Sequence, residues 1–197
     1  MNRAHFYAGV RSSLFGGSLS QSQVNGMEAV LDEAGKAFID PRWLAYMLAT
    51  AFHETGQTMQ PIHERGGTDY FFRMYDPKGQ RPKVAADLGN TQTGDGVRFA
   101  GRGLVQLTGR RNYTTFSKLV GVDLVVNPDA AMQDDVAVRI MFEGMARGLF
   151  TGKKLGDYFT PKSSDWVNAR KIINGLDRAN DIAGYAKRFY DALQDAA

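Results

Sequence analysis

The stretch from Pro61 to Gly101 constrains the fold most, because glycines and prolines interrupt it too often for a long helix or strand. These breaks are Gly66, Gly67, Pro77, Gly79, Pro82, Gly89, Gly94 and Gly96, and the aromatic residues between them are Tyr70, Phe71, Phe72, Tyr75 and Phe99. Long irregular stretches inside a compact domain are usually functional. We therefore expect a smaller lobe of loops, short strands or a small helix over a cleft.

Helical patterns flank this stretch on both sides. Ser20 or Ser22 can cap a helix that ends at Gly35, and Asp40-Pro41 combines an N-cap acid with proline at the first helical position. The helix that begins there should run to about Glu54. Further helices are expected over about 109–121, 134–149, 164–174 and 179–193, with a turn at 127–129.

Length and composition favour one domain. The chain has 197 residues, of which 43% are hydrophobic and 23% charged, enough for one well-packed core. The predicted architecture is a mainly α-helical single domain over residues 1–197. Its core helices occupy about 20–56 and 109–194, and its loop-rich lobe occupies about 57–108.

Several classes of protein are disfavoured by composition. Because there is no cysteine, disulfides, thiolate metal sites and cysteine nucleophiles are excluded. A net charge of +3 is too small to indicate nucleic-acid binding, and no window resembles a membrane span. The first seven residues show no apolar core with a cleavage site, so we expect no secretory signal and synthesis in a cytoplasm.

Glu54, in the segment Phe52-His53-Glu54-Thr55-Gly56, is the first candidate for catalysis. It lies seven residues after Met47, so it should share the apolar face of its helix. Burial of a carboxyl group among apolar neighbours raises its pKa, and a general acid working near neutral pH needs such a shift. The alternatives are an exposed helix-end glutamate or an internal ion pair with Arg65 or Arg102.

Glu64 is the second candidate and lies ten residues further on, beyond Pro61. Its neighbours His63, Arg65 and Gly66-Gly67 indicate a polar, mobile setting, which suits an ionised base that holds a water molecule. The alternative is a solvated loop residue. Two neighbouring carboxyl groups, one in an apolar and one in a wetter setting, are what hydrolysis of a glycosidic bond requires.

The segment from Gly101 to Gly109 offers further polar groups. Gln106 and Thr108 alternate in what we predict to be a short extended segment, so both side chains should point to one face. An amide and a hydroxyl there suit sugar hydroxyls or a positioned water. Alternatively, Thr108 only caps the helix that begins near Gly109.

Other kinds of site do not fit the pattern. His53 and His63 are ten residues apart, and no second histidine follows His53 at the four-residue spacing of a zinc-binding helix. No phosphate-binding loop or Gly-x-Ser-x-Gly turn occurs, and we expect no metal and no cofactor. His53 is better interpreted as a packing or hydrogen-bonding neighbour of Glu54, and Asn174 most simply ends a helix.

The combination of these segments resembles glycoside hydrolase family 19, and most closely its bacteriophage or prophage endolysins. The resemblance runs from about Ser20 to the end of the chain. It rests on His53-Glu54-Thr55-Gly56, Glu64, the Gly101–Gly109 segment with Asn112-Tyr113, and Ile173-Asn174-Gly175.

The resemblance implies a lysozyme-like, two-lobed helical fold and inverting hydrolysis of β-1,4 bonds at N-acetylhexosamine units. It matches Glu54 to the general acid, Glu64 to the base and Thr108 to the residue that helps to hold the water. Sugar-contacting positions match Gln106, Tyr113 and Asn174, and we group His53 with these substrate-binding candidates. The interval between the two glutamates is shorter than in plant chitinases, and the plant cysteines are absent.

The resulting hypothesis is a muramidase-type endolysin that cuts peptidoglycan glycan strands and lyses a bacterial host. It implies a monomer without stable membrane insertion, made in the host cytoplasm and released to the cell wall through holin-type pores. An inverting site places its carboxyl groups about 6.5–9.5 Å apart. The alternatives are a chitinase and a non-catalytic glycan-binding module.

Overall fold

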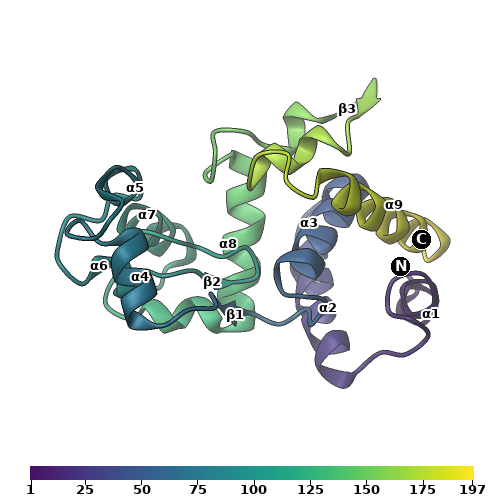
Figure 1. Ribbon diagram of the computed structural model, residues 1–197. Helices are drawn as coiled ribbons and strands as arrows, with labels where there is room; N and C mark the ends of the chain where they lie inside the picture. Colours follow the sequence, from purple (N-terminus) through teal and green to yellow (C-terminus); the bar gives the residue numbers. More distant parts are fainter. The chain divides into compact units, whose positions relative to one another are not determined.

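Helices make up most of the secondary structure of this chain, all 197 residues of which are described by a computed structural model (Figure 1). The chain forms two compact units. One unit combines Met1–Gln60 with Met141–Ala197, and the other is the continuous stretch Pro61–Ile140. The helix α8 (Asp134–Arg147) contributes its first half to the second unit and its last turns to the first.

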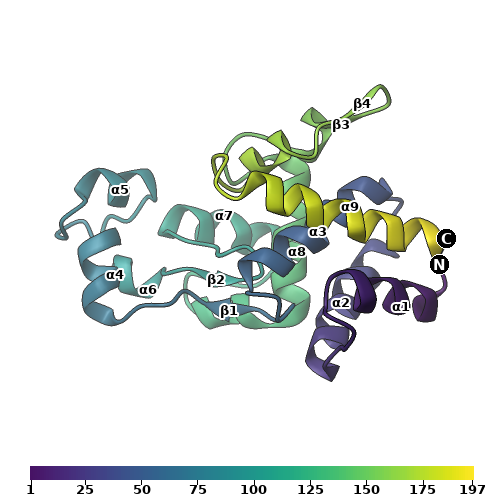
Figure 2. The same cartoon turned by 45° about the vertical axis from the view of Figure 1, so that its right-hand side comes forward.

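The first unit is built on α3 (Pro41–Glu54) and α9 (Ala179–Asp195), which pack along each other. Phe52 of α3 is buried and meets Tyr185 and Phe189 of α9 edge to face, with ring centroids 4.9 and 6.0 Å apart. The helix α1 (Arg3–Ser13) also packs on α9, and the two ends of the chain are joined by a 2.6 Å hydrogen bond from Asn2 N to Ala196 O (Figure 2).

Helix caps confirm the boundaries expected from the sequence in this unit. The helix α2 (Gln21–Ala34) begins with a capping box in which Ser20 and Gln23 exchange side-chain-to-backbone hydrogen bonds. Asp40 caps α3 by accepting from Arg42 N, and Pro41 takes the first helical position. Because these signals are local, they could be read from short stretches of sequence.

The second unit consists of short elements followed by one longer helix. It contains β1 (Ile62–His63), α4 (Thr68–Tyr75), α5 (Pro82–Asp87), α6 (Asp95–Arg98), β2 (Arg102–Gly103), α7 (Arg110–Val120) and the 3₁₀ helix η1 (Pro128–Met132). The strands β1 and β2 are antiparallel, with Ile62 opposite Gly103 and His63 opposite Arg102. The loops, short strands and small helices expected here are therefore present.

The boundaries of the second unit differ from those of the predicted loop-rich lobe, 57–108. The unit also includes α7, because Tyr113 of α7 packs on Phe99 with ring centroids 5.1 Å apart. Arg110 at the start of α7 pairs with the buried Asp95 of α6 at 2.5 Å. These contacts tie α7 to the loops that precede it in sequence.

The prediction of an α-helix over 164–174 is wrong. The chain there forms a hairpin of β3 (Phe159–Thr160) and β4 (Ser163–Ser164), then the short 3₁₀ helix η3 (Asn168–Ile172); a further 3₁₀ helix, η2 (Leu155–Asp157), precedes the hairpin. Asp165 accepts from the backbone and side-chain nitrogens of Asn168 at 3.0 and 2.8 Å, which favours a tight turn over a regular helix. The turn expected at 127–129 continues into η1, and α1 was not expected at all.

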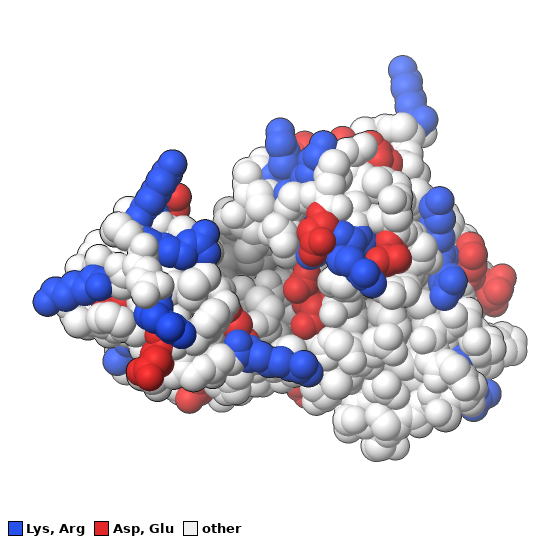
Figure 3. Space-filling model, viewed as in Figure 1, with Lys and Arg blue, Asp and Glu red and all other residues white.

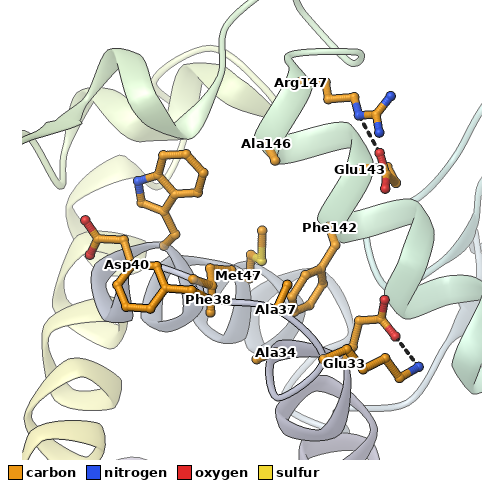
Figure 4. A pocket seen from close by; sticks show the side chains of 13 residues that line it. Glu33, Ala34, Ala37, Phe38, Asp40, Met47, Phe142, Glu143, Ala146 and Arg147 are labelled. Carbon is orange, nitrogen blue, oxygen red and sulfur yellow. Dashed lines mark hydrogen bonds and ion pairs between the residues drawn. The ribbon is translucent and has the colours of Figure 1, made fainter.

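The first unit also contains an apolar pocket of about 580 Å³ between the end of α2, the α2–α3 loop, α3 and α8 (Figure 4). The ion pairs Glu33–Lys36 and Glu143–Arg147 border it at 2.6 and 2.5 Å. None of the candidate site residues lines this pocket. No helix in the structure combines the length and apolar character that crossing a membrane requires.

Replacement by alanine of two glycines in helices should change the free energy of unfolding in opposite directions. A Cβ at Gly26 of α2 would lie 1.8 Å from the Met59 carbonyl oxygen, so Gly26→Ala should lower the free energy of unfolding by ~2 kcal/mol or more. At Gly184 of α9 nothing lies within 4 Å, so Gly184→Ala should raise it by ~0.5–1 kcal/mol. Urea unfolding measures both, and equal effects would contradict this account of how α2 packs.

Candidate functional site

Glu54 is the last residue of α3 and forms a partly buried ion pair with Arg170 of η3. Arg170 Nη1 donates to Glu54 Oε1 at 2.6 Å, and the two side chains are 4% and 18% exposed, respectively. The internal ion pair considered from the sequence is therefore present, but neither Arg65 nor Arg102 supplies it. The purely apolar surroundings expected for Glu54 are wrong, because its carboxylate faces a charge.

Arg170 is held by its own contacts and acts as a fixed support for Glu54. Its Nε donates to the Asp177 carbonyl at 3.1 Å, and its backbone carbonyl accepts from Ile173 N and Asn174 N. A guanidinium this deeply buried needs acceptors in defined directions, and the Glu54 carboxylate and the Asp177 carbonyl are these acceptors.

Sequence reasoning missed Arg170, although a signal was present. Trp166, Ala169, Arg170 and Ile173 follow a helical spacing of three to four residues, which puts an arginine on an otherwise apolar face. A charged residue in such a position is almost never fully buried without a partner. The pattern predicts a carboxylate partner, but it cannot identify one that lies 116 residues earlier.

The two other candidates of the first unit lie next to this pair in sequence. His53 is half-buried, and burial lowers its pKa from the usual value, while the nearby Glu54 charge opposes the shift. A neutral imidazole is thus favoured beside Glu54. Asn174 is exposed; its Oδ1 accepts from Gly175 N at 2.8 Å, and its Nδ2 group remains available for a ligand.

Glu64 follows β1 in the second unit, and donors hold both of its carboxylate oxygens. Tyr75 Oη donates to Oε1 at 2.7 Å and Gly101 N donates to Oε2 at 3.0 Å. Glu64 N in turn donates to Gly101 O at 2.8 Å. The mobile setting expected for Glu64 and the alternative of a freely solvated loop residue are therefore both wrong, because donors hold the side chain in one orientation.

Gly101 makes this arrangement possible by its lack of a side chain. A Cβ at this position would lie 2.9 Å from Glu64 Oε2 and 2.9 Å from Gln106 Oε1, closer than real Cβ atoms approach such groups. The backbone amide of residue 101 reaches the carboxylate only because nothing projects from its Cα.

The extended conformation expected for Gln106 is wrong. Residues 104–106 form a turn, closed by hydrogen bonds between the backbones of Arg102 and Leu107, and Gln106 has a positive φ of 55°. Its amide nitrogen donates to Ile62 O and Gly103 O at 3.1 and 3.3 Å. The side-chain nitrogen thus braces the hairpin, and the side-chain oxygen lies toward Gly101.

Thr108 does not cap α7. Its hydroxyl donates to Gln106 O at 2.9 Å, while Gly109 takes the N-cap position without a side-chain hydrogen bond. A hydroxyl that donates to a carbonyl keeps its lone pairs free to accept from another group, such as a water molecule.

A role of Tyr113 in touching substrate is not compatible with its position, because its side chain is fully buried. The phenol donates to Ala100 O at 3.0 Å and accepts from Arg102 Nη1 at 3.1 Å, and burial raises its pKa to about 12. Arg102 also pairs with Asp129 at 2.8 Å. Tyr113 therefore anchors the segment that carries Gly101.

Glu64 lines a pocket of about 330 Å³ in the second unit. The other lining residues are His63, Gly66, Gly67, Thr68, Phe71, Val97, Ala100, Gly101 and Arg102. An oriented carboxylate beside such a hollow is placed to accept a proton from a bound water molecule. No cluster of three or more histidine and acidic side chains suited to a metal ion occurs in the structure.

The Glu54–Arg170 pair should matter for stability. Arg170→Gln leaves the Glu54 carboxylate without its charged partner, so we expect the free energy of unfolding to fall by ~2–3 kcal/mol. Arg178→Gln is the matched control, since the Arg178–Asp181 pair is largely exposed and should contribute at most ~1 kcal/mol. If urea unfolding gives the same midpoint for both variants, the buried pair is not a structural support.

Comparisons with known proteins identify the family of this chain. A family model for chitinase class I, glycoside hydrolase family 19, matches residues 24–145. Chitinase 8 of Oryza sativa subsp. japonica is 30% identical over 196 residues, an alignment that covers 86% of this chain and 67% of that protein. A glycosyl hydrolase family 19 domain-containing protein of Haemophilus influenzae is 41% identical over 132 residues, covering 57% of this chain and 64% of that protein.

The fold is similar as well. The crystal structure of chitinase C from Streptomyces griseus superimposes with a TM-score of 0.59 at 19% identity, covering 98% of this chain and 75% of that one. The mainly helical, lysozyme-like fold expected from the sequence is confirmed. This chain spans about two thirds of the length of the two relatives named above. Because the family model covers more than half of it, the chain belongs to glycoside hydrolase family 19.

Proposed function

We propose that this protein hydrolyses β-1,4 glycosidic bonds in the glycan strands of peptidoglycan by an inverting mechanism. The observation that carries the proposal is the fixed orientation of the Glu64 carboxylate in a chain that belongs to this family. Its carboxylate is oriented by two donors and lines a pocket, which is the arrangement expected of a base that activates water.

The proposed roles follow from the chemistry of the side chains. Glu54 protonates the leaving oxygen, and Glu64 removes a proton from the water that attacks the opposite face of the sugar. Thr108 accepts a hydrogen bond from that water. Gln106 Oε1, Asn174 and His53 contact sugar groups, the last as a neutral imidazole, while Tyr113 acts only through the backbone that it anchors.

The peptidoglycan proposal draws on surface charge. Lys and Arg side chains gather over α4 and α5 on the face seen in Figure 3, and Arg73, Lys78, Arg81 and Lys83 are all exposed. Of the acids on or beside these helices, Asp76 is fully buried, while Asp69 and Asp87 are exposed and offset two of the four cations, which leaves a surface charge of about +2 here. Peptidoglycan carries carboxylate groups and chitin is uncharged, so a basic surface favours the first polymer.

In the cell we propose an endolysin that lyses a bacterial host. The protein would be made in the host cytoplasm, act as a monomer, and reach the wall after holin-type release. The absence of cysteine fits synthesis in a reducing compartment, and the related Haemophilus protein fits a bacterial setting. Such an enzyme added from outside would be antimicrobial wherever it reaches exposed wall.

The second candidate is a chitinase with the same catalytic groups. The name of the rice relative supports it, and so does that of the Streptomyces structure. The two candidates differ in substrate and share the reaction, so only substrate assays separate them. A non-catalytic glycan-binding module would bind either polymer without releasing product.

Glu54→Gln tests the reaction. Loss of the ionisable acid should reduce release of soluble sugar from purified peptidoglycan by at least ~100-fold. Because the deeply buried Arg170 then keeps an acceptor but loses its charged partner, the free energy of unfolding should fall by ~2–3 kcal/mol, as for Arg170→Gln, so activity is compared at a temperature at which both proteins are folded. Turbidity loss of wall suspensions and thermal unfolding measure the two effects. Normal wall lysis by this variant would show that Glu54 is not the acid.

The substrate is tested by assaying purified peptidoglycan and chitin oligomers side by side. Mass spectrometry of the peptidoglycan digest should find N-acetylmuramic acid at the new reducing ends, as for a muramidase. Replacing Arg81 and Lys83 together by alanine should slow peptidoglycan digestion at low salt and leave chitin-oligomer cleavage unchanged, since salt screens exposed charges. Faster cleavage of chitin than of peptidoglycan would favour the chitinase.

A further inference from the structure

Tyr75 is a phenol that none of the proposed catalytic roles uses, although it contacts Glu64 directly. It is the last residue of α4, and its hydroxyl donates to Glu64 Oε1 at 2.7 Å. The other oxygen of the same carboxylate accepts from Gly101 N. Each carboxylate oxygen therefore has one protein donor, and the two donors come from opposite ends of a stretch of more than twenty residues.

The ring of Tyr75 has two aromatic neighbours. Phe71, one turn earlier on α4, stacks on it with an interplanar angle of 14° and a centroid separation of 6.4 Å. Tyr70 meets it edge to face at 6.5 Å. A ring fixed in this way loses little entropy when its hydroxyl makes a hydrogen bond.

The backbone of Tyr75 is fixed as firmly as its ring. Asn90 Nδ2 donates to the Tyr75 carbonyl at 2.9 Å, and Asn90 Oδ1 accepts from Arg110 N at 2.8 Å. The next residue, Asp76, is fully buried, and its carboxylate accepts from Lys78 N at 3.1 Å and from Gly94 N at 2.7 Å. This set of hydrogen bonds ties α4, the α5–α6 loop and the start of α7 together around Tyr75.

The phenol also stays a donor at every pH at which the enzyme works. Burial raises the pKa of Tyr75 above its usual value, and the hydrogen bond to Glu64 raises it further. A permanently protonated phenol gives Oε1 a donor that does not depend on pH, as the backbone amide does for Oε2.

We propose that Tyr75 is a positioning residue that fixes the plane of the Glu64 carboxylate, so that one lone pair stays directed at the water to be activated. The inference rests on the proposed function, since it assigns a purpose to the orientation of the base. A carboxylate held by Gly101 alone can rotate about its Cγ–Cδ bond. Misalignment of that kind lowers the rate of proton transfer without weakening substrate binding.

Tyr75→Phe tests the proposal, because it keeps the ring stacking and removes only the donor. We expect kcat on peptidoglycan to fall about tenfold with KM within about twofold of wild type. The acidic limb of the pH–rate profile should move to higher pH, since loss of a donor disfavours an ionised carboxylate. The other titratable or charged groups of this region are His63 and Arg65 on either side of Glu64, Tyr70 on α4, Tyr113 on α7 and Arg102 on β2, and all are unchanged in the variant.

Tyr7→Phe is a matched control. Tyr7 Oη donates to Glu28 Oε1 at the same 2.7 Å, also part-buried, in the compact unit that contains neither Glu64 nor Tyr75, and neither residue of this pair is a site candidate. It should show a comparable loss of thermal stability with unchanged kcat and pH profile. A general loss of stability would slow both variants in proportion to their unfolded fractions, and it would not move the pH limb of either.

Glu64→Gln separates the failure of this inference from the failure of the proposed function. If Glu64→Gln is inactive while Tyr75→Phe keeps the kcat and pH profile of wild type, Glu64 is the base and Tyr75 does not position it. If Glu64→Gln remains active, the assignment of the base is wrong and the role of Tyr75 is wrong with it. The inference stands if Tyr75→Phe lowers kcat and moves the acidic limb while Tyr7→Phe does neither.

Discussion

A buried guanidinium, that of Arg170, holds together several segments of the first unit. Arg170 can be held in the interior only where acceptors surround it, and Glu54 and the Asp177 carbonyl are those acceptors. The end of α3 and the η3 segment are thereby fixed against each other, although they are far apart in the chain. The backbone at Arg170 is held as well, because its carbonyl accepts hydrogen bonds from the amides of Ile173 and Asn174 at the end of the 3₁₀ helix η3. The carboxyl group proposed as the acid thus has a charged side chain as its support.

The carboxyl group proposed as the base is supported differently. Glu64 has neutral donors, a phenol and a backbone amide, and no cation is bonded to it. One glutamate is thus held by a charge and the other by dipoles, and this distinguishes their environments more sharply than the contrast of apolar and wet settings expected from the sequence. Different surroundings for two like groups are the usual means of giving them different tasks.

Sequence predicted those parts of the structure whose causes are local. Ser20, Asp40 and Gly121 bound their helices as expected, since a cap depends on residues within one turn. The Gly101–Gly109 segment was wrongly described as extended at Gln106, where φ is positive and the side chain bonds to the Ile62 and Gly103 carbonyls, contacts that the local sequence does not reveal. Arg170 and Tyr75 were missed because their partners lie in other elements. The two candidate glutamates could be identified from local pattern and family resemblance, whereas the residues that hold them, Arg170 and Tyr75, are identified only by the three-dimensional structure.

The order in which the two units occur along the chain has a consequence for synthesis. The unit 61–140 is one uninterrupted stretch, so all of it is synthesised before the second part of the other unit, Met141–Ala197. The unit that carries Glu54 is discontinuous: Phe15 can contact Phe52 early, but the surface of Phe52 that packs on Tyr185 and Phe189 stays uncovered until α9 has been made. Contacts between distant parts of a chain form late. A ribosome-bound or truncated chain that stops before η3 therefore lacks Arg170, the partner of Glu54, and the core of the unit that carries Glu54 is completed only when α9 has been made.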